Sequence, residues 1–348
     1  MNRLLSSLLA FIAITAPGIT EAATLSLKEC LELGRRNNPA LSVIREEREI
    51  AVTGVALAES SNYPRVDLQA GYTMQQAPQA VEISGRSAET QQSSYGHASG
   101  SLAYTLYDFG RRNARQQSAR AGANAAENSV AAREQDVAMQ VIATYFGILE
   151  SHKLVSSSEE EVSQVEEHGK IAEILYQQGV VTRNDLLQAE VRLASARQKL
   201  LSIRSNRENL WLQLNYLTGQ DPSLRTELDE GADIALSESF TVDAKQAVAA
   251  RPDLRAFRKS LEASEYDLDE TRSALYPELF AKLAMDYVEN DKVREQTILS
   301  ATVGLKMNIF DGFATTSSRR RAAQLRTRAA ETLRQAEVQA VLELTTAA

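Results

Sequence analysis

The chain has 348 residues, of which 24% are charged and only 6% aromatic, and its net charge at pH 7 is −8. This length is enough for two or three ordinary domains, and the negative charge argues against nucleic acid as a partner. The single cysteine, Cys30, excludes an internal disulfide framework and a multi-cysteine metal site. It lies in a helical pattern between Leu27 and Leu31, so we expect a buried and inert thiol.

The first residues resemble a secretory signal. Arg3 supplies the basic region, the apolar core lies within residues 4–14, and Ala22 offers a small residue for cleavage. We therefore expect a signal peptide over residues 1–22. No later segment is long and apolar enough for a membrane helix of about 20 residues, so a crossing of a membrane would require a β-barrel.

Two helices and two alternating strands follow in the first half of the chain. Helices are expected over 25–37 and 40–61, because Asn38-Pro39 and Tyr63-Pro64 end them. A β-hairpin is expected over 65–107, since its two ends alternate apolar and polar side chains. Residues 75–94 are polar and rich in Gly and Gln, which predicts a loop between the strands. Ten-residue strands of this kind are typical of transmembrane barrels, and their expected aromatic girdles are Tyr72, Tyr104, Tyr107, Phe280 and Tyr287.

The second half repeats this order, which indicates an internal duplication. The spacing from Pro39 to Pro64 equals the spacing from Pro252 to Pro277, and a second hairpin is expected over 278–309. Each hairpin ends in an aromatic-Asp motif followed by a helix. We interpret the motif residues as structural parts of two strand-to-helix turns, in which the aspartates cap the helices rather than act as paired carboxylates. These residues are Asp108, Gly110, Asp311 and Gly312.

Residues 111–217 read as a long helical hairpin. Residues 111–178 contain no proline and would extend roughly 100 Å at 1.5 Å per residue. Apolar residues recur every seven positions in both arms, which predicts a left-handed coiled coil. The helix breaks at the tip, 179–182, after which Thr182 suits the N-cap and Asp185 the first turn.

The tip is the stretch for which we expect a binding function. A plain helical hairpin also needs a glycine and a cap at this place. An exposed tip at the end of so long a hairpin nevertheless has little purpose other than contact with a partner. The expected contact residues are Gly179, Val180, Val181, Thr182 and Asp185.

No catalytic, metal or cofactor site is evident in the sequence. The histidines (His97, His152 and His168) are scattered without a second ligand at helical spacing. A basic run (Arg319, Arg320, Arg321, Arg326 and Arg328) follows the second aromatic-Asp motif. Because Arg111, Arg112 and Arg115 follow the first motif, we interpret the run as a solvated helix face at a membrane boundary rather than a nucleic-acid site. Trp211 is expected to pack against its neighbours.

Four motifs resemble those of the outer-membrane efflux proteins, the TolC-like family. They are Asn38-Pro39-x-Leu41, Tyr63-Pro64, Tyr107-Asp108-Phe109-Gly110 with its twin Phe310-Asp311-Gly312, and the run from Tyr176 through Gly179, Thr182 and Asp185 to Glu190. The resemblance extends from Thr24 to the end. It implies a mainly α fold with transmembrane β: a homotrimer with a twelve-stranded β-barrel in the outer membrane and an α-barrel in the periplasm. The implied partners are a periplasmic adaptor, an inner-membrane pump or ABC exporter, and outer-membrane lipid.

These observations divide the chain into a signal peptide (1–22), a first repeat (23–219), a connector (220–240) and a second repeat (241–348). The second repeat has only residues 314–348 for its long helix. We therefore expect a C-terminal truncation, with this helix lacking a capping glycine and a packed partner.

The expected function is that of the outer-membrane channel in a tripartite efflux pump or type I secretion system, without enzyme activity. One alternative is a secreted coiled-coil structural or adhesin-like protein without a pore. Another is a truncated channel fragment without function.

Overall fold

A computed structural model describes residues 24–231 and 244–347. The expected signal peptide and much of the expected connector lie outside these ranges. The chain divides into two compact units. One contains the described part of Met1–Pro39 together with Asp136–Leu236, and the other contains Ala40–Gln135 and Ser237–Ala348. The long helix α3 (Arg111–Gln177) contributes to both.

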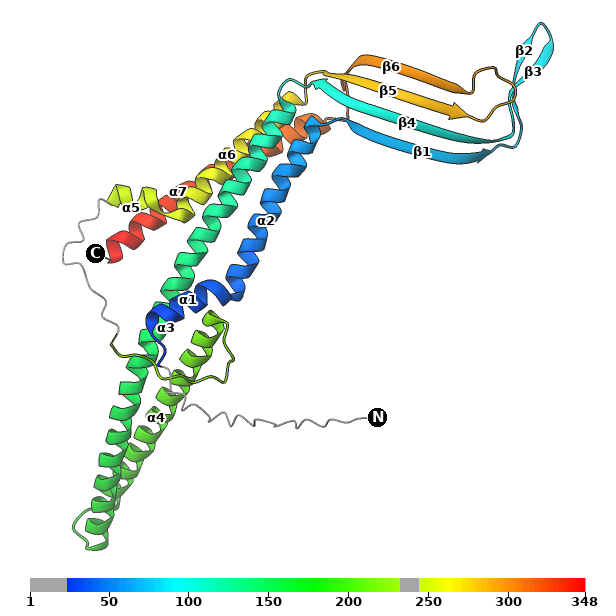
Figure 1. Cartoon of the computed structure of the whole chain (residues 1–348). Helices are drawn as coiled ribbons and strands as arrows, with labels where there is room; N and C mark the ends of the chain where they lie inside the picture. Colours follow the sequence, from blue (N-terminus) through cyan, green and yellow to red (C-terminus); the bar gives the residue numbers. More distant parts are fainter. Residues whose placement is uncertain (1–23, 232–243, 348) are drawn as a thin grey trace, which may run out of the picture. The chain divides into compact units, whose positions relative to one another are not determined.

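A four-stranded antiparallel sheet forms one end of the second unit (Figure 1). Its strands are β1 (Arg65–Met74), β4 (Ser94–Tyr107), β5 (Glu278–Val288) and β6 (Thr297–Lys306). The strand order is β1-β4-β5-β6, so the hairpins of the two repeats join through β4 and β5. Within the described ranges, the outer edges of β1 and β6 pair with no other strand.

The two faces of this sheet differ in chemistry. Leu68, Gly100, Met285 and Leu299 follow one another across the four strands, and their neighbours on the same face are also apolar. The large apolar side chains exposed on this face are Val66, Leu68, Tyr72, Met74, Leu283, Met285, Tyr287, Leu299, Val303 and Leu305. The opposite face carries mainly polar residues, such as the row Gln69, Ser99 and Asp286. The predicted alternation of faces is therefore present.

The segment between β1 and β4 contains a second hairpin, so the prediction of a loop over 75–94 is wrong. β2 (Gln79–Ile83) pairs with β3 (Arg86–Gln91) through a turn in which Ser84 and Gly85 both have positive φ. The buried side chain of Asn290 donates a hydrogen bond of 2.8 Å to the carbonyl oxygen of Thr90. This bond ties the base of the hairpin to the loop that follows β5.

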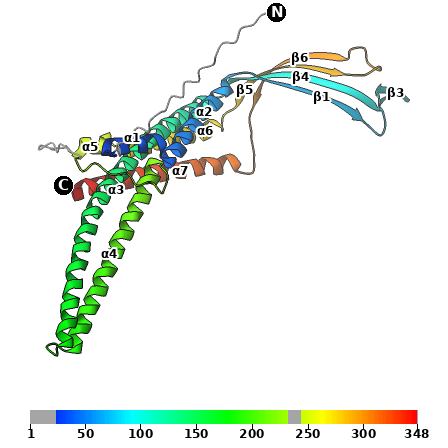
Figure 2. The same ribbon diagram turned by 60° about the horizontal axis from the view of Figure 1, so that its bottom comes forward.

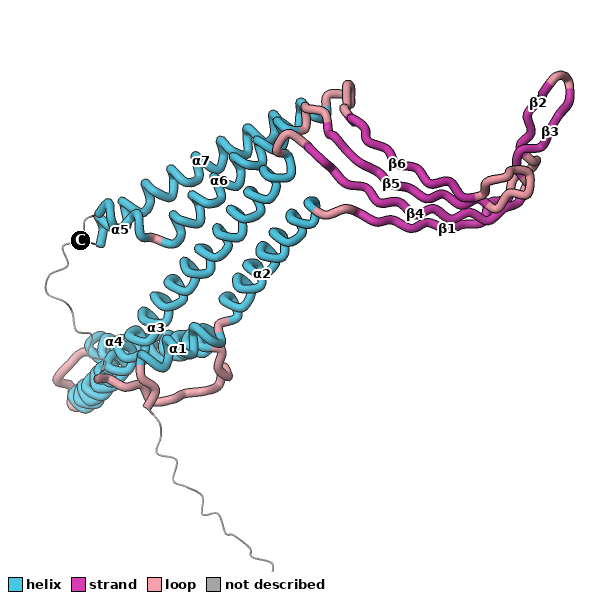
Figure 3. The backbone as a smooth tube through the Cα atoms, turned by 45° about the horizontal axis from the view of Figure 1, so that its top comes forward, coloured by secondary structure: helices cyan, strands magenta, loops and turns pink. Residues whose placement is uncertain are grey.

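Helices run side by side from the same end of the sheet in the second unit (Figure 3). They are α2 (Pro39–Glu59), which ends in a short 3₁₀ turn (Ser60–Asn62), the first part of α3, α6 (Pro252–Ser273) and α7 (Ala314–Ala347), with α5 (Ala244–Ala250) preceding α6. Two ion pairs join α6 to α7, Arg258–Glu337 and Arg326–Glu265, and a third joins Arg251, the residue before α6, to Glu343. Ala322 and Ala340 of α7 are buried as well. The expectation that α7 lacks a packed partner is therefore wrong.

The first unit is built on the helical hairpin that the heptad pattern predicts. The second part of α3 and α4 (Arg183–Thr218) lie side by side (Figure 2). Two heptad rows of α3 are buried, namely Val141, Ile148 and Val155 and their companions Thr144, Ser151 and Ser158. Ion pairs such as Glu166–Arg197 and Glu161–Lys199 link the exposed sides of the two helices. None of the helices in the described ranges combines the length and apolar character needed to cross a membrane.

The short helix α1 (Leu27–Asn37) closes the first unit against the end of α4. Gly219 ends α4 at a φ of 66°, and a Cβ there would lie 2.6 Å from the carbonyl oxygen of Asn37, so only glycine fits. The Asn38 amide donates to the carbonyl oxygen of Leu217 over 3.0 Å. Cys30 is fully buried, and this burial raises the pKa of its thiol to about 12. As expected, Cys30 is a buried thiol and Trp211 packs in the interior.

Candidate functional site

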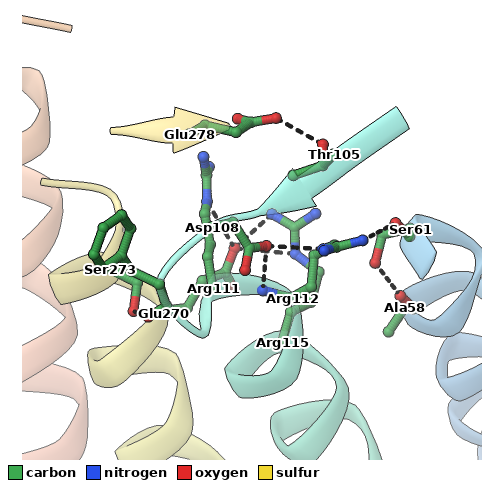
Figure 4. Close-up of polar contacts among 11 residues, drawn as sticks. Ala58, Ser61, Thr105, Asp108, Arg111, Arg112, Arg115, Glu270, Ser273 and Glu278 are labelled. Carbon is green, nitrogen blue, oxygen red and sulfur yellow. Dashed lines mark hydrogen bonds and ion pairs between the residues drawn. The ribbon is translucent and has the colours of Figure 1, made fainter. Parts of the chain in front are cut away.

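The first strand-to-helix turn connects β4 to α3 through two residues with positive φ, Phe109 (54°) and Gly110 (87°). The Asp108 carboxylate accepts hydrogen bonds of 3.0 Å from the backbone N–H and from Nε of Arg112 (Figure 4). Arg112 also donates to the carbonyl oxygen of Ser61 over 3.3 Å. Asp108 thus holds the first turn of α3 and, through Arg112, fixes that turn to the end of α2.

The second turn, between β6 and α7, also has two successive residues with positive φ, here with glycine before phenylalanine. Gly312 and Phe313 have φ values of 65° and 68°. The Asp311 carboxylate accepts from the backbone N–H of Thr315 over 2.9 Å, four residues on, as Asp108 does from Arg112. Each aspartate thus accepts a hydrogen bond from a backbone N–H in the first turn of the helix that follows, which is how a capping side chain acts.

Exposed aromatic side chains surround both turns, and we call them the aromatic collar: Tyr63, Tyr107, Phe109, Tyr276, Phe310 and Phe313. The Phe109 ring stacks on Tyr276 at 5.1 Å, and Phe310 meets Phe313 edge to face at 5.6 Å. The collar contains one of the predicted girdle residues, Tyr107. The girdle prediction is wrong for Phe280, which lies on the polar face. Its ring covers Gly304 on the neighbouring strand so closely that a Cβ there would lie 3.0 Å from the ring.

A cavity of about 940 Å³ lies at the base of the polar face, beside the first turn. Its charged lining consists of Arg65, Arg111, Arg112, Arg115 and Lys306 with the carboxylates of Asp108 and Glu278. Glu278 accepts a hydrogen bond of 2.7 Å from Thr105, and Glu270 pairs with Arg115 (Figure 4). Most of these cations are thus held by carboxylates of the same chain. Within the described ranges no cluster of three His, Cys, Asp or Glu residues could hold a metal ion.

The tip of the helical hairpin is a tightly hydrogen-bonded turn. Gly179 has a φ of 74°, and its N–H donates to the carbonyl oxygen of Tyr176 while that of Val180 donates to Leu175. Thr182 and Asp185 form a reciprocal cap: the Asp185 carboxylate accepts from the backbone N–H of Thr182 over 2.8 Å and from its hydroxyl over 2.7 Å. These two hydrogen bonds lower the pKa of Asp185.

The tip also exposes apolar side chains. Val180 is 66% exposed at the turn itself, and the exposed apolar residues on the adjoining helix ends are Ile174, Tyr176, Leu187 and Val191. A fixed turn with an apolar surface suits contact with another protein. The turn and the cap would also be present in a helical hairpin without a partner, so the predicted contact role remains a prediction.

Comparison with known proteins decides the family. The family model described as outer membrane efflux protein matches residues 31–220 and 244–348. The chain belongs to the outer membrane efflux protein family. Members of this family are outer-membrane transport conduits with a periplasmic extension rather than enzymes.

The chain is similar to three curated proteins, though it spans less than two thirds of the length of any of them. It is 23% identical over 303 residues to Protein CyaE of Bordetella pertussis, covering 83% of this chain and 61% of that protein. Identity with outer membrane protein TolC of Vibrio cholerae is 22%, over 84% of this chain and 66% of that protein. Identity with alkaline protease secretion protein AprF of Pseudomonas aeruginosa is 20% (87% and 64% covered).

Solved structures agree on the fold. The Campylobacter jejuni CmeC outer membrane channel superposes with a TM-score of 0.76 at 18% identity, covering 90% of this chain and 68% of that one. VceC of Vibrio cholerae gives a TM-score of 0.73 at 18% identity, with 92% and 77% covered. The predicted fold class is therefore confirmed as that of the TolC-like channels.

Proposed function

We propose that three copies of this chain form a passive export channel in the outer membrane. The channel receives its cargo from an inner-membrane pump or ABC exporter through a periplasmic adaptor. The observation that carries this proposal is the two-faced sheet, which is exposed on both sides and open at the outer edges of β1 and β6.

Four strands cannot close a barrel, whereas twelve can. Pairing of β6 in one copy with β1 in the next provides hydrogen-bond partners for both open edges. Without such pairing, the open edges would promote aggregation. In such a barrel the face bearing Leu68, Met285 and Leu299 meets lipid, and the face bearing Gln69 and Asp286 lines an aqueous lumen. A secreted coiled coil without a pore gives no role to this apolar face.

The tip supports the adaptor part of the proposal. Gly179 to Thr182 present a rigid turn with an exposed Val180, and Asp185 holds it in place. The similarity to an alkaline protease secretion protein favours protein secretion as a second form of the same function. In both forms the channel itself selects little, and the inner-membrane component selects the cargo.

The channel function is tested in a strain that lacks its own outer-membrane duct. Expression of the gene should restore resistance to a pump substrate, and the protein should run as a trimer on a semi-native gel of the outer membrane. A stably inserted trimer that neither restores export nor conducts ions in a planar bilayer would contradict the proposal.

The tip is tested with two replacements of Gly179. Valine disfavours the left-handed backbone that the turn requires, while asparagine tolerates it. Gly179→Val should abolish export and cross-linking to the adaptor but leave the trimer intact, and Gly179→Asn should keep both. Equal adaptor cross-linking in the two variants would show that the tip is not the contact.

A further inference from the structure

The first turns of α7 carry three consecutive arginines that the proposed function does not use. We propose that Arg319, Arg320 and Arg321 bind the anionic phospholipid headgroups of the periplasmic leaflet. This inference rests on the proposed insertion of the trimer into the outer membrane. It adds a lipid class to that function and assigns the site to one helix.

The position of the arginines relative to the aromatic collar places them at headgroup depth. Exposed Phe310 and Phe313 lie directly before α7, and aromatic residues mark the boundary between hydrocarbon and headgroups. At 1.5 Å per residue, Arg319 to Arg321 lie about 8–11 Å from the start of the helix. The headgroup layer is about 5–8 Å thick on each side, so extended arginine side chains reach it.

The charge of these arginines is not balanced by the chain itself. In the first repeat, Arg112 pairs with Asp108, Arg115 with Glu270, and Arg120 with Glu59. Arg319, Arg320 and Arg321 are exposed, and none makes an ion pair in the described part of the chain. Further along α7, Arg326 pairs with Glu265.

At the positions that match the carboxylates facing α3, a neighbouring copy offers α7 no carboxylate. In the chain, α3 lies between α2 and α6, since it pairs with Glu59 on one side and Glu270 on the other. By the internal duplication, α7 would lie between α6 and α2 of the next copy. The position before Pro64 that corresponds to Glu270 before Pro277 is occupied by Leu57. The position that corresponds to Asp267 is Gly54.

The three side chains also cannot all be hidden between helices. Consecutive helical residues are about 100° apart, so Arg319 to Arg321 span about 200° of the helix surface. Arg326, one turn after the buried Ala322, pairs with Glu265, so this side of α7 faces α6, and a second neighbour would cover the other side. At least one arginine therefore faces away from both neighbouring helices, and on the outer side of the helix, below the membrane, anionic lipid is the counterion at hand.

The test compares two triple variants of the intact protein. Arg319→Gln, Arg320→Gln and Arg321→Gln together remove the proposed site. Arg326→Gln, Arg328→Gln and Arg334→Gln together remove the same charge from the same helix, but about 18–30 Å from its start. Each protein is placed in nanodiscs of phosphatidylethanolamine mixed with phosphatidylglycerol. The protein is then extracted with detergent, and the bound molecules of each lipid are counted by native mass spectrometry.

The wild type and the control variant should retain phosphatidylglycerol in preference to phosphatidylethanolamine. An arginine near an anionic surface strengthens binding by about five-fold, so the site variant should lose at least that much preference. Equal preference in both variants, or none in the wild type, overturns the inference while leaving the channel intact. If the trimers of the site variant dissociate equally in both lipids, the arginines bind a second copy of the chain rather than lipid. That result also overturns the inference. Failure of the wild type to insert into any nanodisc contradicts the proposed function as well.

Discussion

Replacement of Leu68 by lysine should prevent stable insertion of the sheet, whereas the same replacement of Gln69 should be tolerated. Leu68 is 83% exposed, lies near the middle of β1, and shares its face with Met285 and Leu299. A lysine on the lipid face costs about 2–4 kcal/mol near the bilayer midplane. With one lysine per chain, a trimer loses about 6–12 kcal/mol, which is comparable to the entire stability of an ordinary domain.

Gln69 is the matched control, because it is the next residue of the same strand and is also exposed, but on the polar face. In an isolated sheet in water, both lysines would be solvated, and each would change stability by no more than about 0.5 kcal/mol. The assay is the yield of trimer in the outer membrane, followed by guanidinium unfolding of the trimer in vesicles. Equal yields and midpoints for Leu68→Lys and Gln69→Lys would refute the assignment of the apolar face to lipid.

Three further predictions follow from the contacts of single residues. Asp108→Ala should lower stability by about 1–3 kcal/mol, because it removes a helix cap and leaves the mostly buried Arg112 without its carboxylate; Asp108→Asn should recover part of this in thermal unfolding, and an equal loss in both variants would contradict the cap. The Cys30 thiol should not react with a disulfide reagent at pH 8 until the protein unfolds, because burial raises its pKa to about 12; rapid labelling of the native protein would contradict that burial. The pKa of the Asp185 carboxylate is lowered because Thr182 donates hydrogen bonds to it. Its contribution to the stability of the tip is therefore complete at pH values above the ordinary pKa of 3.8, and it disappears as the pH falls through the lower pKa of the folded state. The protection of tip amides against hydrogen exchange, taken relative to the intrinsic rate at each pH, should therefore fall at acid pH in the wild type but change less with pH in Asp185→Asn.

The elements with regular periodicity could be predicted from the sequence. Alternation placed β1, β4, β5 and β6 close to their observed bounds, because a strand with one lipid-facing side leaves a direct trace in every second residue. The heptads likewise predicted the α3 and α4 hairpin. The capping residues Thr182 and Asp185 could be recognised because the capping box is a local pattern with fixed spacing.

The errors arose where position or distant contact decides the structure. The β2 and β3 hairpin has a weak apolar pattern, and its turn is made by Ser84-Gly85 rather than the common Asn-Gly. The packing of α7 depends on pairs such as Arg258 and Glu337, far apart in the chain, which no local pattern reveals. Phe280 was assigned to a girdle by its place near a strand end, although Leu279 and Ala281 on either side already implied that it faces the other way.

The pairing of β4 with β5 has a consequence for the order of biogenesis. Gly96 and Glu289, which meet where these strands join, are 193 positions apart in the chain. If the chain is exported N-terminus first, as the predicted signal peptide requires, the first hairpin reaches the periplasm long before its neighbour, with Leu68 and the rest of its apolar face bare. Because the sheet cannot be completed until the second hairpin arrives, the apolar face of the first hairpin stays uncovered in the meantime. Slowing export late in the chain should increase the time spent in this exposed state and the loss of protein to proteolysis.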